Sequence, residues 1–382
     1  MLFLVLKEVI TIKKILFGIT SLTLGGAERV LVDISNKLSE KYDITIFSIY
    51  DNGELKNDLN KNVKFKALYN CRYDELTKLQ KMWIPIKILL FSKIIYNKKI
   101  KQNYDTEIAF LEGPITRLFS TKNKDVHKIA WIHNDIEKVF GNDLKSKIKK
   151  YIDKNIYKKY NDLVFVSQDN MEKFQNIYND LNTENMHVIY NYIDKDLLIK
   201  KSNYNIKVEF DYNSINFLTV CRLVKQKAID RFIRVHSKLI KRGLKHKVYI
   251  IGDGPEKENL QKLIKQENVE DTFVLLGKKE NPYPYIKNAN YFCLLSEFEG
   301  YGMVLEEAKI LNKPIIITNT AARECIENYP KALILENSED EIYDGLYKLL
   351  NDNDDKIFNN TQTNTEYDNT EKLQKIIELV GD

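Results

Sequence analysis

The chain has 382 residues, of which 43% are hydrophobic and 30% are charged, a balance that excludes a disordered or fibrous protein and leaves room for two folded domains. The 59 Lys and Arg residues outnumber the 54 Asp and Glu residues by a margin too small to indicate nucleic-acid binding. Four isolated cysteines without CxxC spacing exclude a disulfide scaffold, so we interpret them as reduced structural thiols.

The first twenty residues, MLFLVLKEVITIKKILFGIT, begin with an apolar run that Lys7 and Glu8 interrupt. The run is too short to span a bilayer, and no small-residue cleavage site follows it. We therefore expect a cytoplasmic protein that contacts a membrane, if at all, only on the inner face.

Short β-branched runs then alternate with longer helical patterns along the chain. Continuous apolar strands interleaved with helices are typical of parallel sheets covered on both faces, and there are too many strands for one sheet. The fold class expected is therefore α/β with two sheets. The expected strands are KILFGIT, DITIFSIY, VKFKALY, EIAFLE, KIAWIH, DLVFVS, HVIYN, INFLTV, KVYIIG, TFVLLG, YFCLLS, PIIITN and ALILE.

A polar stretch without periodicity, residues 194–213, separates the two sets of strands. We expect a first domain at 1–200, a second at 201–361, and a polar loop with a C-terminal helix at 362–382. Two such domains joined by one linker predict a cleft between them, with ligand-binding residues at the carboxyl ends of the strands.

Two motifs rich in glycine follow strands. In SLTLGGAERVL, Gly25 and Gly26 allow the backbone to approach a ligand, although a plain tight turn into a helix explains them equally well. In IIGDGPEK the third glycine of a dinucleotide fingerprint is absent and Lys257 replaces it, which favours a turn that starts a helix. Neither motif matches a dinucleotide or Walker loop.

A cationic motif, CRLVKQK, places Arg222 at the end of a strand and Lys227 five positions later. A guanidinium and an ammonium at a strand end suit a diphosphate, while the alternative is that both are solvated loop cations. Spacing alone does not rank Lys225 against Lys227.

An acidic motif, SEFEGYGMVLEEAKIL, places Glu299 and Glu307 eight positions apart across a turn into a helix. The free amides at the start of such a helix favour an anion. Glu307 falls on the apolar stripe of Val304 and Leu311, where an unpaired carboxylate is costly and a ligand hydroxyl would satisfy it. A solvated helix face is the alternative interpretation.

Taken together, these motifs resemble those of the retaining glycosyltransferases of family 4, which have the GT-B fold. EGYGMVLEEAKILNKPII resembles the EX7E signature of that family, and GGAER, WIHND, VIYNYID, RLVKQK and GDGP resemble its other landmarks, in the same order, over nearly the whole chain. The chain departs from the family pattern at Cys221, at Ala228 and at Tyr192, which affects the expected loop details but not the charged residues.

The resemblance implies two Rossmann-like domains facing across a central cleft and a role for each matching residue. Arg222 and Lys227 would hold the donor diphosphate, Glu307 the ribose, and Glu299 the transferred sugar. The implied catalytic residues are His133, Arg222, Lys227 and Glu299. The implied donor-binding residues are Gly25, Gly26, Gly277, Tyr301, Gly302, Met303, Val304 and Glu307.

The resemblance also implies the reaction: a hexosyltransferase moves a sugar, with retention, from a nucleotide sugar, expected to be a UDP-sugar, to a lipid-linked or polymer glycan in cell-surface polysaccharide biosynthesis. Fixed cations and helix amides would stabilise the leaving diphosphate, and no DxD pair stands at a matching strand end. We therefore expect no metal and no other cofactor. The alternatives are a protein-borne acceptor, or a non-catalytic GT-B subunit of a transferase complex, which would have no need to keep the donor-site charges.

Two segments of the first domain, residues 81–102 and 143–160, mix lysines with aromatic and aliphatic residues at near-helical spacing. Such segments suit an anionic membrane surface or a lipid diphosphate, while amphipathic core helices with solvated lysines are the alternative. The partners expected are thus a nucleotide sugar, a glycan or lipid-linked acceptor and an anionic membrane, but no nucleic acid.

Overall fold

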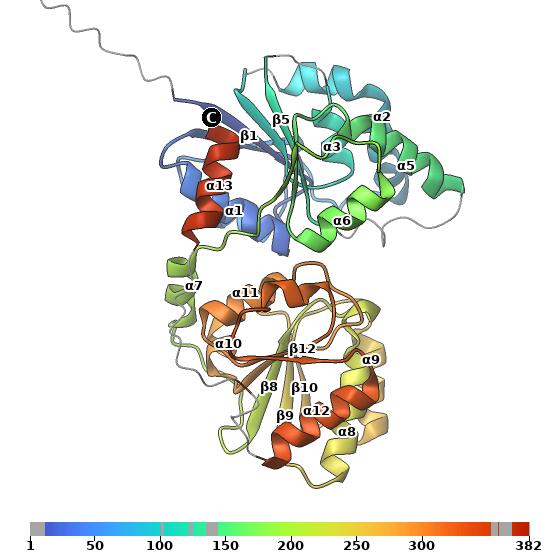
Figure 1. The fold of residues 1–382 in the computed structure, drawn as a ribbon, viewed down its shortest axis with the longest axis vertical. Helices are drawn as coiled ribbons and strands as arrows, with labels where there is room; N and C mark the ends of the chain where they lie inside the picture. Colours follow the sequence, from blue (N-terminus) through green and yellow to red (C-terminus); the bar gives the residue numbers. More distant parts are fainter. Residues whose placement is uncertain are drawn as a thin grey trace, which may run out of the picture. The chain divides into compact units, whose positions relative to one another are not determined.

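The computed structural model describes residues 12–100, 103–121, 125–134, 144–352, 358 and 369–381. The chain divides into two compact units, the first comprising residues 1–192 with 369–382 and the second residues 193–368 (Figure 1).

The first unit is built on a seven-stranded parallel sheet with the order β3-β2-β1-β4-β5-β6-β7. Its central strands are buried on both faces, as their continuous apolar sequences require. The strands are β1 (Lys14–Ile19), β2 (Asp43–Tyr50), β3 (Lys64–Tyr69), β4 (Thr106–Ala109), β5 (His127–Ile132), β6 (Asp162–Phe165) and β7 (Met186–Val188).

Helices cover both faces of this sheet. A single hydrophobic core joins one face to α2 (Lys78–Lys99), α3 (Pro114–Phe119), α5 (Leu144–Tyr157) and α6 (Gln168–Ile177). Figure 1 shows α1 (Gly26–Leu38) and α13 (Thr370–Gly381) on the other face. A 3₁₀ helix, η1 (Glu54–Asp58), follows β2.

The starts of two of these helices follow from sequence. Thr77 caps α2 by accepting from the backbone N–H of Gln80, whose side chain accepts in turn from the N–H of Thr77, a complete capping box. Ser167 caps α6 by accepting from the N–H of Asn170.

The C-terminal helix α13 is far in sequence from the strands that it packs on. Ile376 and Val380 are buried, and the carbonyl of Val380 accepts a hydrogen bond of 3.1 Å from the hydroxyl of Thr106 in β4. Lys13 donates to the carbonyl of Gly381. The end of the chain is therefore part of the first unit.

The second unit is built on a six-stranded parallel sheet with the order β10-β9-β8-β11-β12-β13. The helices α8, α9 and α12 share one core with one face of it. The strands are β8 (Ile215–Val220), β9 (His246–Ile251), β10 (Phe273–Gly277), β11 (Tyr291–Leu294), β12 (Ile315–Thr318) and β13 (Ala332–Leu335), and the helices are α7 (Lys195–Ser202), η2 (Lys225–Lys227), α8 (Ile229–Lys241), α9 (Lys257–Glu267), α10 (Tyr283–Asn288), α11 (Met303–Ile310), η3 (Ala321–Cys325) and α12 (Glu339–Asp352).

The expected α/β class with two parallel sheets is confirmed, and each expected strand is present. The expected boundary at residue 200 falls inside α7, which the division assigns to the second unit. Residues 1–11 of the N-terminal apolar run lie outside the described residues. Within the described part of the chain, none of the helices is long and apolar enough to cross a bilayer.

Candidate functional site

The motifs of the second unit gather at the carboxyl edge of its sheet. The strands β8 and β11 are neighbours in the sheet, so the loops that follow them meet. The backbone N–H of Glu297 donates to the carbonyl of Gln226, and the Gln226 side chain donates to the carbonyl of Phe298, each over 2.9 Å. The cationic and acidic motifs therefore form one surface, although 75 positions separate Arg222 from Glu297 in the sequence.

Lys227 and Glu299 form an ion pair at this edge. Nζ of Lys227 lies 2.5 Å from Oε1 of Glu299, and the two side chains are 18% and 7% exposed. The hydroxyl of Ser296 donates to the same carboxylate oxygen over 2.5 Å. A short, largely buried contact of this kind holds both charges in fixed positions.

Arg222 lies in the same loop as Lys227 but differs in its surroundings. Its side chain is exposed, and within the described residues it makes no side-chain hydrogen bond. Lys225 is also exposed, so the geometry separates it from the largely buried Lys227 as spacing could not. Burial raises the pKa of the neighbouring Cys221 thiol to about 12, which excludes it as a nucleophile near neutral pH.

The start of α11 presents a left-handed glycine followed by free backbone amides. Gly302 has a φ of 72° and is the N-cap residue of the helix, a conformation that favours glycine. Met303 and Val304 form the first turn and are half-buried. The buried Tyr301 donates its hydroxyl to Glu306, and this contact fixes the loop to the helix.

Glu307 lies one turn further into α11 and is buried. Its Oε1 accepts a hydrogen bond of 3.3 Å from the hydroxyl of Tyr283, the first residue of α10. Sequence reasoning missed Tyr283, because the tyrosine lies 24 positions before the glutamate and only the packing of α10 beside α11 joins them.

The glycines after β9 serve the packing of loops. A Cβ atom on Gly252 would lie 1.8 Å from the carbonyl oxygen of Cys221, and one on Gly254 would lie 2.3 Å from that of Leu223. The structural interpretation of GDGP fits this geometry. Gly277 at the end of β10 has a φ of 70° and open space where a side chain would stand, and its carbonyl accepts from the N–H of Gly252 over 3.0 Å.

In the first unit, Gly25 and Gly26 start α1 directly after the loop that follows β1. A Cβ atom on Gly25 would lie 2.2 Å from a carboxylate oxygen of Glu28, which folds back over the helix start. Burial raises the pKa of Glu28. Because the Glu28 side chain is flexible and Gly25 has an extended φ of −150°, local packing does not by itself require glycine at position 25.

His133 follows β5, with its ring against Phe110 at a centroid distance of 4.7 Å. Burial lowers the pKa of His133 to about 3, so the imidazole is neutral at physiological pH. Its Nε2 is buried and has no hydrogen-bond partner among the residues described. Such an unsatisfied ring nitrogen is able to accept a proton or hydrogen bond from a ligand.

Glu112 holds the loop that carries His133, and sequence reasoning missed it. One carboxylate oxygen accepts from the backbone N–H groups of His133 and Asn134, each over 2.7 Å, and the other accepts from the Asn134 side chain over 2.9 Å. Burial raises the pKa of Glu112. In the sequence, the position of Glu112 in EGP at the end of a strand is only weak evidence that this residue belongs to a site.

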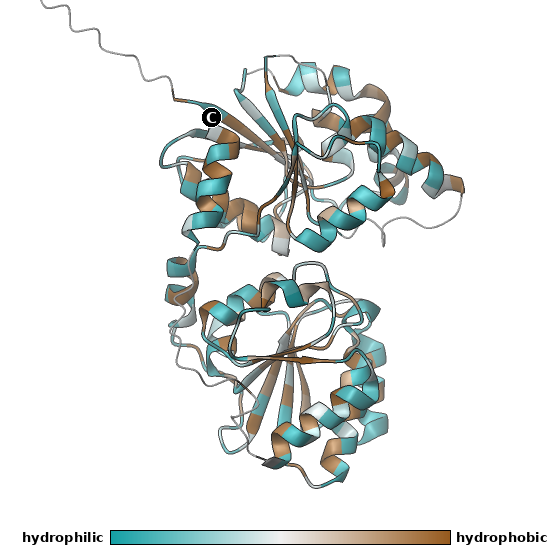
Figure 2. Ribbon diagram, in the orientation of Figure 1, coloured by the Kyte–Doolittle hydropathy of each residue, from teal (hydrophilic) through white to brown (hydrophobic). Residues whose placement is uncertain are grey.

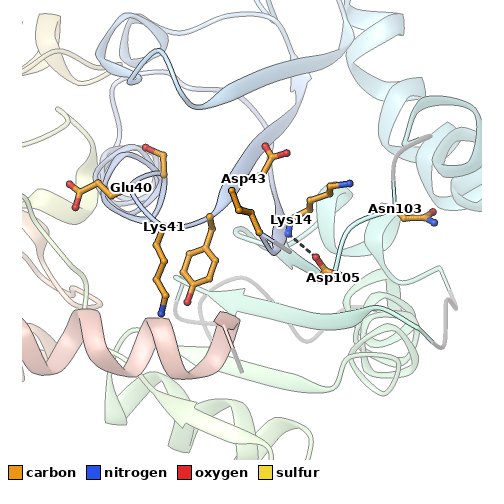
Figure 3. A pocket seen from close by; sticks show the side chains of 9 residues that line it. Lys14, Glu40, Lys41, Asp43, Asn103 and Asp105 are labelled. Atoms are coloured by element: carbon orange, nitrogen blue, oxygen red, sulfur yellow. Dashed lines mark hydrogen bonds between the residues drawn. The ribbon is translucent and has the colours of Figure 1, made fainter. Parts of the chain in front are cut away.

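A shallow pocket lies at the opposite, amino-terminal edge of the first sheet (Figure 3). It includes Lys14, Asp43 and Asp105, and the Asp105 carboxylate accepts from the backbone N–H of Lys14 over 2.7 Å. The pocket contains none of the site residues that the sequence predicts. In the described portion of the chain, no three His, Cys, Asp or Glu side chains are grouped so as to hold a metal ion.

Comparison with known proteins gives a family match for the C-terminal part of the chain and a fold for both units. Residues 200–367 match the family model "Glycosyl transferases group 1". A Campylobacter jejuni protein named N-acetylgalactosamine-N,N'-diacetylbacillosaminyl-diphospho-undecaprenol 4-alpha-N-acetylgalactosaminyltransferase is 28% identical over 342 residues, which cover 87% of this chain and 89% of that protein. The poly(ribitol-phosphate) alpha-N-acetylglucosaminyltransferase of Staphylococcus aureus is 24% identical over 68% of this chain and 51% of its own length.

Two solved structures share the fold. The structure of Anabaena HepE with UDP and glucose aligns with a TM-score of 0.72 and 16% identity, covering 96% of this chain and 98% of its own. The crystal structure of TarM aligns with a TM-score of 0.73 and 16% identity, covering 98% and 99%. Both likenesses extend over the two units, so they show the fold of both.

Proposed function

Because residues 200–367 match the group 1 glycosyltransferase model and both units share the fold of glycosyltransferase structures, we propose that this chain is a group 1 glycosyltransferase that transfers a sugar, with retention of configuration, from a UDP-sugar to a glycan acceptor. The observation that carries this proposal is the Lys227–Glu299 pair beside Arg222 and the start of α11. In this arrangement the cations can bind a diphosphate, and the carboxylate can accept hydrogen bonds from sugar hydroxyls.

The donor diphosphate lies, in this proposal, against Arg222, Lys227 and the first amides of α11. Negative charge grows on the leaving diphosphate as the glycosidic bond breaks, and fixed cations and amides stabilise it most when it is fully formed. Lys227 pairs with Glu299, so a diphosphate bound there competes with that carboxylate for the ammonium group. Glu299 then accepts hydrogen bonds from the sugar hydroxyls, and Glu307 from the ribose.

The acceptor oxygen attacks the anomeric carbon on the face that the diphosphate leaves, and the leaving phosphate takes up the acceptor proton. This order of events needs no nucleophile from the protein. In the first unit, Gly25, Gly26 and His133 contribute to the reaction; the neutral imidazole of His133 accepts a hydrogen bond from the sugar through Nε2.

The acceptor class is supported by the names of the relatives. The C. jejuni relative is named for a diphospho-undecaprenol-linked glycan, and the S. aureus relative for poly(ribitol-phosphate). We assign to this chain a lipid-linked or polymer glycan in cell-surface polysaccharide biosynthesis, reached from the inner face of the membrane.

The proposed function is tested with a panel of UDP-sugars that includes UDP-N-acetylglucosamine, UDP-N-acetylgalactosamine and UDP-glucose. Release of UDP is followed with water and with a lipid diphosphate glycan as acceptor. We expect one donor to be turned over much faster when the acceptor is present. Absence of both binding and turnover across the panel would favour a non-catalytic subunit instead.

Metal independence is a separate prediction. Because Arg222, Lys227 and helix amides are expected to supply the positive charge, turnover is expected to persist in excess chelator. Loss of turnover in chelator that magnesium or manganese restores would show that a divalent ion carries part of this charge.

A further inference from the structure

The helix α2 is apolar on two faces, and only one of them is buried. Ile84, Ile88 and Tyr96 pack into the core of the first unit. Leu79, Trp83 and Leu90 are 66%, 58% and 67% exposed. The exposed set has helical spacing along one side of the helix before the kink at Phe91, where it contains Leu79, Met82, Trp83, Ile86 and Leu90, and Ile94 follows the kink. We call these six side chains the α2 stripe.

The neighbouring helix α5 repeats the pattern. Leu144, Ile148 and Tyr151 are exposed and are spaced four and three positions apart. Both α2 and α5 pack against α3 and share one core, so the two helices lie on the same face of the first sheet (Figure 1). Figure 2 shows apolar residues interspersed with hydrophilic ones along these helices. Exposed apolar surface of this extent marks an interaction site.

The charges on α2 itself are of one sign, although the exposed Asp74 and Glu75 precede the helix. The 22 residues of α2 contain Lys78, Lys81, Lys87, Lys93, Lys98 and Lys99 and no acidic residue. Five of the 14 residues of α5 are lysines. Its one acid, Asp153, accepts from the guanidinium of Arg117 over 2.8 Å and is mostly buried.

This charge pattern disfavours a second copy of the chain as the occupant. In a twofold dimer the same face meets itself, so the lysines of one α2 would face those of the other with no carboxylate on the helix to pair with them. Protein interfaces are also depleted in lysine. An anionic lipid surface offers both phosphates for the ammonium groups and an acyl boundary for the apolar side chains.

A buried polar network holds the C-terminal end of α2, after its kink at Phe91. Near its C-terminal end, Tyr96 donates its hydroxyl to Glu107 of β4, and Lys128 of β5 lies 2.6 Å from the other oxygen of that carboxylate. Lys128 also donates to the carbonyl of Phe119 at the end of α3, over 2.8 Å. A buried, hydrogen-bonded ion pair therefore ties α3 and the part of α2 that follows the kink at Phe91 to the sheet, while Ile84 and Ile88 pack the part before the kink into the core.

We propose that the α2 stripe, with the exposed face of α5, inserts its apolar side chains into an anionic lipid surface while the flanking lysines contact phosphate groups. The inference rests on the proposed function only in taking the acceptor to be membrane-borne. The proposed contact differs from purely electrostatic attachment, because apolar side chains are buried in the lipid. The binding free energy from that burial persists at high salt, where the attraction between charges is screened.

The two tryptophans make the test direct. Trp83 is in the α2 stripe, and Trp131 is fully buried in β5, so a change of emission on adding vesicles reports Trp83. With vesicles of phosphatidylcholine containing phosphatidylglycerol, we expect a blue shift, and quenching by brominated acyl chains. Binding without either change would show that the contact is electrostatic only and would overturn the proposal.

The matched variants separate insertion from charge. Leu79→Ser with Trp83→Ser and Leu90→Ser is expected to weaken vesicle binding at least tenfold and to abolish the part that survives in about 1 M salt, where charges are screened within about 3 Å. The control, Tyr204→Ser with Ile206→Ser and Tyr212→Ser, removes three exposed apolar side chains of the second unit and is expected to bind like wild type.

Two further measurements distinguish lipid insertion from self-association and from a loss of enzyme activity. If wild type sediments as a dimer and ignores vesicles while the stripe variant is monomeric, the face is a self-interface and the proposal is wrong. UDP-sugar hydrolysis in lipid-free solution is expected to be equal in wild type and the stripe variant. Vesicle binding by wild type without any turnover would refute the proposed function and leave the lipid contact standing.

Discussion

At the scale of the residue, the pairing of Lys227 with Glu299 changes what a substitution at either position is expected to do. Arg222 is exposed, whereas Lys227 neutralises a carboxylate that is 7% exposed. Removing one partner of such a pair leaves a buried charge, which costs more than losing a surface ion pair. Stability and turnover must therefore be measured separately for each variant.

For the cations, Arg222→Ala and Lys227→Ala are each expected to lower turnover about 100-fold, the scale of losing one charge-stabilising donor. Arg222→Ala is expected to leave the unfolding midpoint unchanged, while Lys227→Ala costs on the order of 2 kcal/mol because Glu299 loses its partner. The exposed Lys225→Ala is the control. Wild-type turnover in either cation variant would remove that residue from the proposed mechanism.

For the acids, Glu307→Gln is expected to weaken UDP binding, because Glu307 is assigned to the ribose. Glu299→Gln is expected to keep or increase UDP affinity, since the amide no longer competes with the diphosphate for Lys227, and to impair sugar transfer. Calorimetry with UDP and turnover with the UDP-sugar separate the two effects. Equal losses of UDP affinity in both variants would contradict this division of roles.

At the scale of the element, a buried histidine pair joins α8, β9 and the turn before β10. His246 Nδ1 lies 3.0 Å from the carbonyl of Leu244, which can only accept, so Nδ1 carries the proton and Nε2 accepts. His236 Nδ1, 2.8 Å from that Nε2, must then donate. His236 Nε2 consequently accepts from the hydroxyl of Thr272 over 2.8 Å, which is shorter than the 3.3 Å from that hydroxyl to the carbonyl of Val269. The hydrogen bonds thus define both tautomers of a neutral pair.

This pair predicts acid sensitivity of the second unit. Burial lowers the pKa of His246 to about 4 and that of His236 to about 2, whereas both titrate near 6.5 when unfolded. Between about pH 6.5 and 4 the unfolded chain binds protons that the folded chain does not. The free energy of unfolding therefore falls by up to about 1.4 kcal/mol per pH unit for each histidine as the pH is lowered.

The measurement is denaturant unfolding of the second unit from pH 7.5 to 4.5. The double variant His236→Leu with His246→Leu is expected to lose this pH slope, whatever its absolute stability. The control is His187→Gln, which changes a partly exposed histidine of the first unit. An unchanged slope in the double variant would show that other groups cause the acid sensitivity.

At the scale of the whole molecule, the C-terminal helix closes the first unit, although the second unit lies between them in sequence. Ile376 of α13 is fully buried, and Gln374 of the same helix is exposed. Ile376→Ala is expected to destabilise the first unit by roughly 2–4 kcal/mol through a core cavity, and Gln374→Ala to change it little. Calorimetry that resolves the two units checks this; equal effects of the two changes would mean that α13 contributes no core.

The candidate site shows how far prediction from sequence extends. Lys227, Glu299 and Glu307 could be selected because charged residues beside strand ends and on apolar stripes are conspicuous in a linear pattern. Tyr283 and Glu112 could not be selected from the sequence. Tyr283 becomes informative only because packing places its hydroxyl against Glu307. Glu112 becomes informative only because its carboxylate accepts from the backbone N–H of His133. The roles assigned to all of these residues remain predictions.

The two parallel sheets, their strands and the resemblance to group 1 glycosyltransferases could be predicted from the sequence, because apolar periodicity and motif order are local properties of the chain. Tertiary structure alone decided that Lys227 pairs with Glu299, that α13 belongs to the first unit, and that α2 exposes one apolar face. The residue type alone does not show whether an apolar side chain on a helix faces the core or the solvent. Only the packing of the sheet against Ile84, Ile88 and Tyr96 leaves Leu79, Trp83 and Leu90 outside.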